Sequence, residues 1–249
     1  MKNVLSPKLI LLANRVAKIP FAKKILKPFY YPYKKHLDNR RNKVYRENAL
    51  DVLSTFDQCL TENGYNYILI FGTLLGAVRE KGFIKHDADI DTAIWIEDFD
   101  EINIHRVLTE RGFVLDHKYE IDGGKLAKEV TYVMKDVSID IFCIYPAIDT
   151  YPYVSSKWSP VDGYITNEES MKKAGYITGK RLELPLKKKI VRTSFEGLQL
   201  PIPENAEEVL AFYYGEDYMN PNPSWYECND FPYRKPWGNE YPATYVKMH

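Results

Sequence analysis

The apolar and polar positions of this chain follow two periods, and together they predict an ordered series of helices and strands. Spacings of three and four residues indicate helices, whereas alternation or a short β-branched run indicates strands. We expect helices at 42–62, 74–82 and 98–111, and strands at 65–71, 88–96, 113–119, 125–134 and 137–145. This order predicts an α/β (α+β) unit with a mixed sheet and flanking helices.

The pattern changes after residue 146 to shorter strands and loops. A hairpin is expected around Glu196-Gly197, followed by a helix in which Asn205 is the N-cap and Glu208 occupies the capping-box position. The last thirty residues hold five prolines and many aromatic residues, and we expect them to form an irregular tail.

The composition is that of a globular protein. Of the 249 residues, 45% are hydrophobic and 27% are charged. A chain of this size and composition can build a full core. Cys59, Cys143 and Cys228 lie far apart, which disfavours a zinc site and favours free thiols in a reducing compartment. No apolar run is long enough to span a membrane, and Arg15 and Lys18 interrupt the only stretch that resembles a signal peptide. We therefore expect a cytoplasmic protein.

The formal net charge of zero hides a strong polarity along the chain. Residues 1–46 contain thirteen Lys or Arg and a single acid, Asp38. We divide the chain into a basic amphipathic segment, 1–41, and a catalytic domain, 42–249, and expect the segment to lie on an anionic membrane surface, at the inner face of a bacterial cytoplasmic membrane. A solvated helix or a helix packed on a partner is the alternative for the segment. Nucleic acid is not expected as a partner, because the rest of the chain is acidic.

Acidic residues at alternate positions suggest a metal site. On a strand, Asp89 and Asp91 point to the same face while Ile90 points into the core. Two carboxylates about 4 Å apart repel by roughly 4 kcal/mol at an effective dielectric constant near 20, so a cation is expected between them. Asp140, flanked by isoleucines on a later strand, supplies a third acid. Hard oxygen ligands of this kind suit Mg²⁺ (or Mn²⁺) and phosphoryl transfer.

A glycine-containing turn before the acids suggests a phosphate site. Gly72 and Thr73 lie where a strand gives way to a helix, and backbone N–H groups at a helix N-terminus bind phosphate. Arg79 and Lys81 follow and could neutralise phosphate charge. Each feature alone occurs often on ordinary surfaces; their order along the chain is more specific.

That order resembles a known family. The string "FGTLLGAVREKGFIKHDADID" is similar to the motif G-T-L-L-G-A-x-R-x-x-G-[FI]-[IP]-x-x-D-x-D-[IV]-D of the LicD/fukutin family, and "FEGLQLPIPENAEEVLAFYYGEDYMNPNP" resembles its closing block. The resemblance implies a nucleotidyltransferase-like fold and metal-dependent transfer of a phospho-alcohol from a CDP-activated donor to a sugar hydroxyl of a glycan or lipid-linked oligosaccharide.

The resemblance also assigns residues. The catalytic set is Asp87, Asp89, Asp91 and Asp140, the metal ligands are Asp89, Asp91 and Asp140, and the donor-binding residues are Gly72, Thr73, Gly76, Arg79 and Lys81. Either Asp140 or Asp87 would be the general base. The sequence departs from bacterial relatives, which read W-D-D-D-I-D where this chain reads "HDADID" from His86 to Asp91. Attachment of a whole nucleotide, or a scaffold that has lost catalysis, are the alternative functions.

Overall fold

The computed structural model describes the backbone of residues 20–85, 87–146, 153–164, 166–222, 234–237 and 241–248, and the side chains of these ranges except at 20–40, 153–156 and 234–236. The expected amphipathic segment therefore lies outside the described residues at 1–19, as do His86 and Cys228. Of 20–40, only the helical backbone is described.

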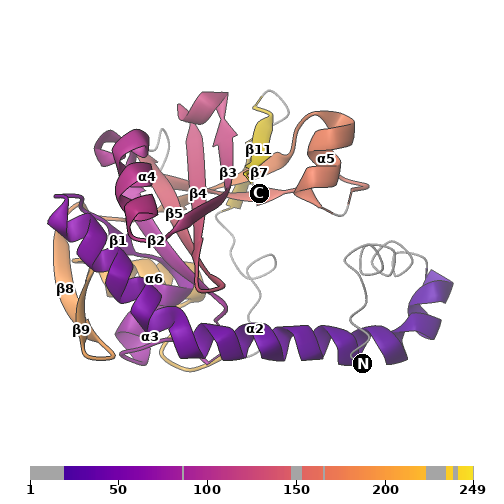
Figure 1. Cartoon of the computed structure of the whole chain (residues 1–249), viewed down its shortest axis with the longest axis horizontal. Coiled ribbons are helices and arrows are strands. Elements are labelled where there is room, and N and C mark those ends of the chain that lie inside the picture. The colour runs from indigo at the N-terminus through magenta and orange to yellow at the C-terminus, as the bar shows by residue number, and fades with distance from the viewer. Residues whose placement is uncertain are drawn as a thin grey trace.

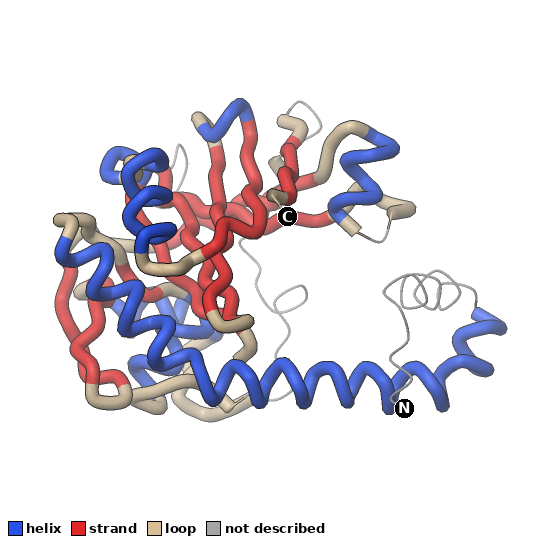
Figure 2. The backbone as a smooth tube through the Cα atoms, in the orientation of Figure 1, coloured by secondary structure: helices blue, strands red, loops and turns tan. Residues whose placement is uncertain are grey.

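A mixed sheet forms the centre of the fold, with helices along its sides (Figures 1 and 2). Its main path runs in the order β10-β7-β6-β5-β4-β3-β11, and β1 and β2 join it through β5. The bounds are β1 Ile68–Leu69, β2 Asp89–Trp95, β3 Val114–Ile121, β4 Ala127–Met134, β5 Val137–Pro146, β6 Tyr153–Ser159, β7 Thr178–Leu184, β10 Arg234–Pro236 and β11 Ala243–Lys247. The described pairs are antiparallel except β2 with β5, which is parallel. The mixed α/β fold expected from the sequence is confirmed.

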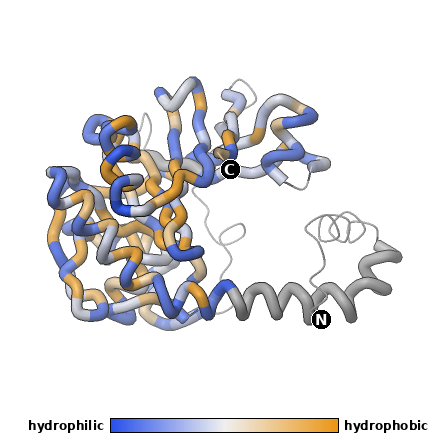
Figure 3. The backbone as a smooth tube through the Cα atoms, in the orientation of Figure 1, coloured by the Kyte–Doolittle hydropathy of each residue, from blue (hydrophilic) through white to orange (hydrophobic). Residues whose placement is uncertain are grey.

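The helices and a hairpin surround this sheet. Their bounds are α2 Pro20–Glu62, α3 Phe71–Arg79, α4 Glu101–Glu110, α5 Asn167–Ala174 and α6 Ala206–Tyr214, with short 3-10 turns η1 Ile96–Asp98 and η2 Asp122–Gly124, and hairpin strands β8 Ile190–Phe195 and β9 Leu198–Pro203. Apolar residues concentrate where α3, α4, α6 and the C-terminal half of α2 meet the strands (Figure 3). No helix among the described residues is long and apolar enough to cross a membrane.

The buried core explains why alternation along β2 and β5 could be read correctly. Ile90, Ile139 and Ile141 are completely buried and belong to one cluster with Val52 and Phe56 of α2. The residues between them on each strand project from the opposite face of the sheet. The acids of these strands therefore share the opposite face, on which the buried Ala93 and Phe142 follow them along the strands.

Several boundaries differ from the sequence expectations. The helix expected at 42–62 begins at Pro20, a position where proline is favoured because its missing N–H has no helical partner. The period of apolar residues placed the start of this helix at residue 42, because the residues just before it have no apolar stripe. The expected boundary between 41 and 42 lies within this helix. Gly72 and Thr73 were expected to precede the second helix but lie in its first turn, after a β1 of only two residues.

The C-terminal region also differs. The expected irregular tail contains β10 and β11, both of which pair with the main sheet. Asn205 is the N-cap of α6, but its side chain does not cap the helix. It accepts from the Lys187 N–H at 3.1 Å and donates to the Pro185 carbonyl at 2.6 Å and to Glu208 at 2.8 Å. The expected capping box is therefore wrong, because a neighbouring backbone segment takes the amide.

Candidate active site

Two parallel strands bring the predicted acids together. Asp91 of β2 lies directly opposite Asp140 of β5 in the strand register, and Asp89 lies two residues earlier on the same face. Neighbouring side chains in such a pair lie about 5 Å apart at their origins. The structure thus places three acidic side chains side by side at one end of two strands that are separated by almost fifty residues of sequence.

The N-terminus of α3 closes this group from one side. The Gly72 N–H donates to Asp91 Oδ2 at 3.2 Å, and Thr73 Oγ1 accepts from the Asp91 N–H at 2.9 Å. A β-carbon at Gly72 would lie 3.3 Å from Asp87 Oδ1 and 3.5 Å from Asp91 Oδ2. Asp87 and Asp91 therefore flank the start of the helix, where a side chain larger than that of glycine would press against both carboxylates. Phe71 makes the sharp entry into the helix with a φ of 48°.

Negative charge accumulates in this group beyond what the neighbouring cations offset. Burial, together with repulsion from Asp89, raises the pKa of Asp87 to about 7. Burial raises the pKa of Asp140 to about 6, even though a hydrogen bond from Thr131 favours its ionised form. Burial also raises the pKa of Asp91 well above its ordinary value, and the charge of Lys157 opposes the rise. A cation at this site would remove most of this penalty.

Lys157 of β6 is a site residue that the sequence did not reveal. Its Nζ lies 4.5 Å from the centre of the Phe71 ring and 4.9 Å from that of Phe142, so a cation stands over two aromatic faces beside the acids. Its charge lowers the pKa of Asp91 and Asp140. No motif surrounds Lys157, and only the sheet order brings β6 close to the site.

The helix α2 also reaches the site. Arg41 Nη2 lies 3.4 Å from Asp89 Oδ2 and donates to the Ala88 carbonyl at 3.1 Å. The Tyr45 hydroxyl donates to the Asp89 carbonyl at 2.9 Å. Arg41 was assigned to the membrane-associating segment, but the structure places its guanidinium beside a predicted metal ligand. The Arg41 side chain is 56% exposed. An ion pair this open to solvent is weak and can exchange partners.

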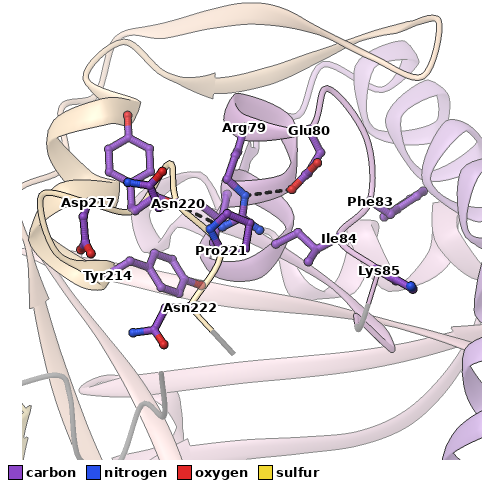
Figure 4. Close-up of a pocket in the computed structure, with 12 residues that line it drawn as sticks. Arg79, Glu80, Phe83, Ile84, Lys85, Tyr214, Asp217, Asn220, Pro221 and Asn222 are labelled. Carbon is purple, nitrogen blue, oxygen red and sulfur yellow. Dashed lines mark hydrogen bonds and ion pairs between the residues drawn. The ribbon is translucent and has the colours of Figure 1, made fainter. Parts of the chain in front are cut away.

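The remaining predicted donor-binding residues occupy the far end of α3 and the turn that follows. Arg79 donates to the Tyr218 carbonyl at 3.1 Å and pairs with Glu80 at 2.9 Å. It lines a cavity of about 630 Å³ with Leu75, Tyr214 and Asn220 (Figure 4). Lys81 is exposed and adopts a positive φ of 57° in the turn.

Gly76 permits close packing of its helix against the following turn. A β-carbon there would lie 2.4 Å from the carbonyl oxygen of Gly82. Its position is therefore explained by this backbone contact, and it does not face the acids.

The donor set fits a divalent cation. Asp87 Oδ2 is buried and has no hydrogen-bond partner among the described residues, so it is available for a metal or a protonated group. Within the same residues no three His, Cys, Asp or Glu side chains already form a ligand cluster. Mg²⁺ is commonly held through one or two carboxylates, with water and substrate phosphates completing its shell.

Replacing Asp87 with asparagine is expected to stabilise the metal-free protein. Because the folded-state pKa is raised to about 7 from 3.8, the folded protein binds the extra proton between these values, and stability falls as the pH rises through this window. The variant should gain about 2 kcal/mol of unfolding free energy at pH 8 and much less at pH 5. The gain at pH 8 is smaller than the full pKa shift would give, because Asp87 is partly exposed to solvent. Urea unfolding in EDTA at both pH values measures this, with the exposed Asp98→Asn as the control. Equal gains at both pH values would contradict it.

Comparison with known proteins agrees with this arrangement. The family model described as LicD/FKTN/FKRP, nucleotidyltransferase domain, matches residues 64–205, more than half of the chain and a range that includes all the predicted site residues. The protein RP689 of Rickettsia prowazekii is 30% identical over 126 residues, 48% of this chain and 44% of that protein.

The relatives also include transferases by name. The mouse ribitol-5-phosphate transferase FKTN is 33% identical over 109 residues, 43% of this chain and 23% of that protein. The human ribitol-5-phosphate transferase FKTN is 25% identical over 185 residues, 73% of this chain and 35% of that protein. The chain thus spans less than half the length of each of these three relatives. The family model matches the segment that holds the acids, the α3 N-terminus and the β8–β9 hairpin. This chain therefore belongs to the LicD/FKTN/FKRP nucleotidyltransferase-domain family.

Proposed function

We propose that this chain is a metal-dependent transferase that moves a phospho-alcohol from a CDP-activated donor to a sugar hydroxyl and releases CMP. The observation that carries the proposal is the placement of Asp91 opposite Asp140, with Asp87 and the N-terminus of α3 on the adjoining side. Acids and a helix N-terminus together suit a phosphate–cation pair, since each binds one partner. Membership of a family that includes ribitol-5-phosphate transferases supports a phospho-alcohol as the transferred group.

Each side of the site has a part in binding the donor diphosphate. The N–H groups in the first turn of α3 would donate to phosphate oxygens beside Gly72, with a cation between the phosphate and the Asp87 and Asp91 carboxylates. Lys157, and Arg41 after it leaves Asp89, would neutralise further charge. Asp89, Asp91 and Asp140 would hold Mg²⁺ or Mn²⁺. When bound, the ion would neutralise the diphosphate and ease departure of CMP.

The chemical step is an in-line displacement at phosphorus. The acceptor hydroxyl oxygen forms a bond to the β-phosphorus, the bond from that phosphorus to the bridging oxygen breaks, and CMP leaves with the electron pair. The hydroxyl proton passes to Asp140 or Asp87. In the metal-free protein burial raises the pKa of Asp87 to about 7, close to neutral pH, where a general base is both available and basic enough.

The cavity at the far end of α3 would receive the nucleoside of the donor. Gly72, Leu75 and Arg79 are spaced three and four residues apart, so they share one face of the helix, and this face leads from the acids to the cavity. Tyr214 and Tyr218 offer aromatic surfaces there, and the cavity volume of about 630 Å³ suits a small molecule. Figure 4 shows Arg79 of α3 beside Tyr214 at the end of α6 and Asn220 of the segment that follows α6.

A bulky residue at the rim of this cavity should weaken donor binding. Asn220→Trp is expected to raise the donor KM about tenfold with a smaller change in kcat, because the indole occupies space that the nucleoside needs but lies away from the acids. Asn220 is exposed, so the fold should tolerate the change. Met219→Trp is the matched control, since Met219 is 51% exposed and does not line the cavity. Equal KM values for the two variants would place the nucleoside elsewhere.

The acceptor proposed for this enzyme is a cell-surface glycan or its lipid-linked precursor. The concentration of Lys and Arg in residues 1–46 supports work at an anionic membrane surface, at the cytoplasmic face of a bacterial membrane. The backbone of α2 extends from the sheet toward this basic end (Figure 1), which would keep the acids within reach of a membrane-bound acceptor.

Thermal stabilisation by candidate donors tests the proposal. CDP-ribitol, CDP-choline, CDP-glycerol, CDP-ethanolamine, CTP and ATP would each be added with and without Mg²⁺. A donor at a hundredfold over its Kd adds about 2.7 kcal/mol and should raise Tm by roughly 5–10 °C. Metal-dependent stabilisation by one CDP-alcohol is expected. A response to CTP or ATP alone would favour transfer of a whole nucleotide, and no response to any nucleotide would contradict catalysis by this site.

A further inference from the structure

Asp140 is hydrogen-bonded to the first of a series of polar side chains that have no part in the proposed reaction. Thr131 Oγ1 on β4 donates to Asp140 Oδ1 at 2.6 Å and lies 3.2 Å from His117 Nε2 on β3. His117 Nδ1 in turn lies 2.6 Å from Asp116 Oδ2. The four side chains therefore form one continuous series, which starts at the predicted catalytic acid on β5 and ends on β3, two strands away.

An irregularity in β3 makes this series possible. The register of β3 with β4 shifts between Leu115 and His117, which leaves Asp116 as an additional residue without a partner on β4. Consecutive residues of a regular strand point to opposite faces, so Asp116 could not reach the ring of His117 without this bulge. Bulges of this kind turn a side chain toward a neighbour, and this one joins Asp116 to the face that carries Asp140.

The strand β11 fixes the bulge. The Met248 N–H donates to the Asp116 carbonyl at 2.9 Å, and Lys247 Nζ lies 3.0 Å from both carboxylate oxygens of Asp116. Lys247 also pairs with His117 in the strand register. The backbone and the side chain of Asp116 are thus both held by the C-terminal strand, so the position of His117 depends on β11.

We infer that Thr131 and His117 are positioning residues, which fix the orientation of the Asp140 carboxylate for metal binding and catalysis. This inference rests on the proposed function. The Thr131 hydroxyl has one hydrogen, and donation to Asp140 leaves its oxygen as an acceptor toward His117 Nε2–H, so the complete series, with Nδ1–H toward Asp116, needs a hydrogen on both ring nitrogens. Thr131 is 3% exposed, so its hydroxyl has little access to water as a substitute partner. Each member of the series thereby limits the rotation of the next.

Paired substitutions separate this role from simple packing. Thr131→Val keeps the shape but removes the hydrogen bond, whereas Thr131→Ser keeps the hydroxyl. His117→Leu removes the ring nitrogens, whereas the amide of His117→Gln can replace Nε2–H. For each variant we would measure kcat and KM with the donor identified by thermal stabilisation, the Kd for Mn²⁺ alone, and Tm.

The valine and leucine variants are expected to lower kcat by about 10–100-fold and to raise the Kd for Mn²⁺ about tenfold, with little change in KM, as found when partners of metal ligands are removed. Thr131→Ser and His117→Gln should lie within about threefold of the wild type. The double variant Thr131→Val/His117→Leu should be no worse than Thr131→Val alone, because the residues act in series.

If Thr131→Val kept the wild-type kcat and Mn²⁺ affinity, this inference would be overturned. It would also be overturned if the kcat losses of the two single variants multiplied in the double variant. Either outcome would leave the proposed function intact. Lack of turnover by the wild type with every CDP donor would instead contradict the proposed function, and the Mn²⁺ affinities would still decide the positioning role. If Thr131→Val fails to fold, the comparison of His117→Leu with His117→Gln decides it, since both variants keep a side chain of similar size at a position that is 19% exposed.

Discussion

Replacing Asp91 with asparagine is expected to lower kcat by about a thousandfold, or about 4 kcal/mol of transition-state stabilisation, and to leave the protein folded. Asp91 is the acid that joins the other parts of the site: it lies opposite Asp140, and it accepts the Gly72 N–H at 3.2 Å. An asparagine oxygen can still accept that hydrogen bond, so the loss comes from the charge. Because burial raises the pKa of Asp91, Tm of the metal-free variant should be equal to or higher than that of the wild type.

Glu129→Gln is the matched control for this variant. Glu129 is also a buried acid on the same side of the sheet, its pKa is raised by burial, and it accepts from Trp158 Nε1 at 2.7 Å. It is not part of the proposed metal or phosphate site, so its kcat should stay within about fivefold of the wild type. Steady-state rates of CMP release measure both variants. If Asp91→Asn kept more than a tenth of the wild-type kcat, the metal assignment would be wrong.

The second large effect is expected at the start of α3, where Gly72→Ala should lower kcat by about a hundredfold with a change in Tm of only a few degrees. The added methyl group would lie 3.3 Å from Asp87 Oδ1 and 3.5 Å from Asp91 Oδ2. It would occupy the space over which phosphate would approach the helix N-terminus. These contacts are close but tolerable, because two carboxylate side chains can shift by a small fraction of a bond length. The substitution should therefore impair phosphate and metal binding more than folding.

Gly76→Ala gives the opposite outcome on the same helix. Its methyl group would lie 2.4 Å from the Gly82 carbonyl oxygen, a backbone atom that cannot move without displacing the turn after α3. We expect a loss of about 2–3 kcal/mol of unfolding free energy, in the range found for overpacked sites. Urea unfolding and kcat would be measured for both variants. Similar losses of stability at the two positions would show that Gly72 serves packing rather than phosphate binding.

The sequence was sufficient for the parts of the site that depend on local pattern. Alternation around Ile90, Ile139 and Ile141 predicted which face of β2 and β5 carries the acids. On a strand with one buried face, every second residue is apolar, so the residues between them lie on the other face. The G-T pair after a β-branched run likewise located a helix N-terminus. The parallel register that sets Asp91 opposite Asp140 agrees with the expectation that the acids converge.

The other parts of the site depend on sheet order and could not be predicted. Lys157 comes close to the acids only because β6 adds to the end of β5, and no local pattern encodes that pairing. The role of His117 could not be predicted, because the bulge at Asp116 that gives it a partner has no signature in the sequence. Arg41 was read with the basic N-terminus, because a polar stretch of helix carries no periodic signal.

The identity of the two products tests the central claim most directly. The protein would be incubated with Mg²⁺, a sugar acceptor and the CDP-alcohol that stabilises it, and both the acceptor and the released nucleotide would be weighed by mass spectrometry. Phospho-alcohol transfer predicts an acceptor heavier by the alcohol phosphate and one CMP released per transfer, with neither formed by Asp91→Asn. An acceptor that instead gains a nucleotide from CTP, with release of pyrophosphate, would show attack at the α-phosphorus and contradict the account.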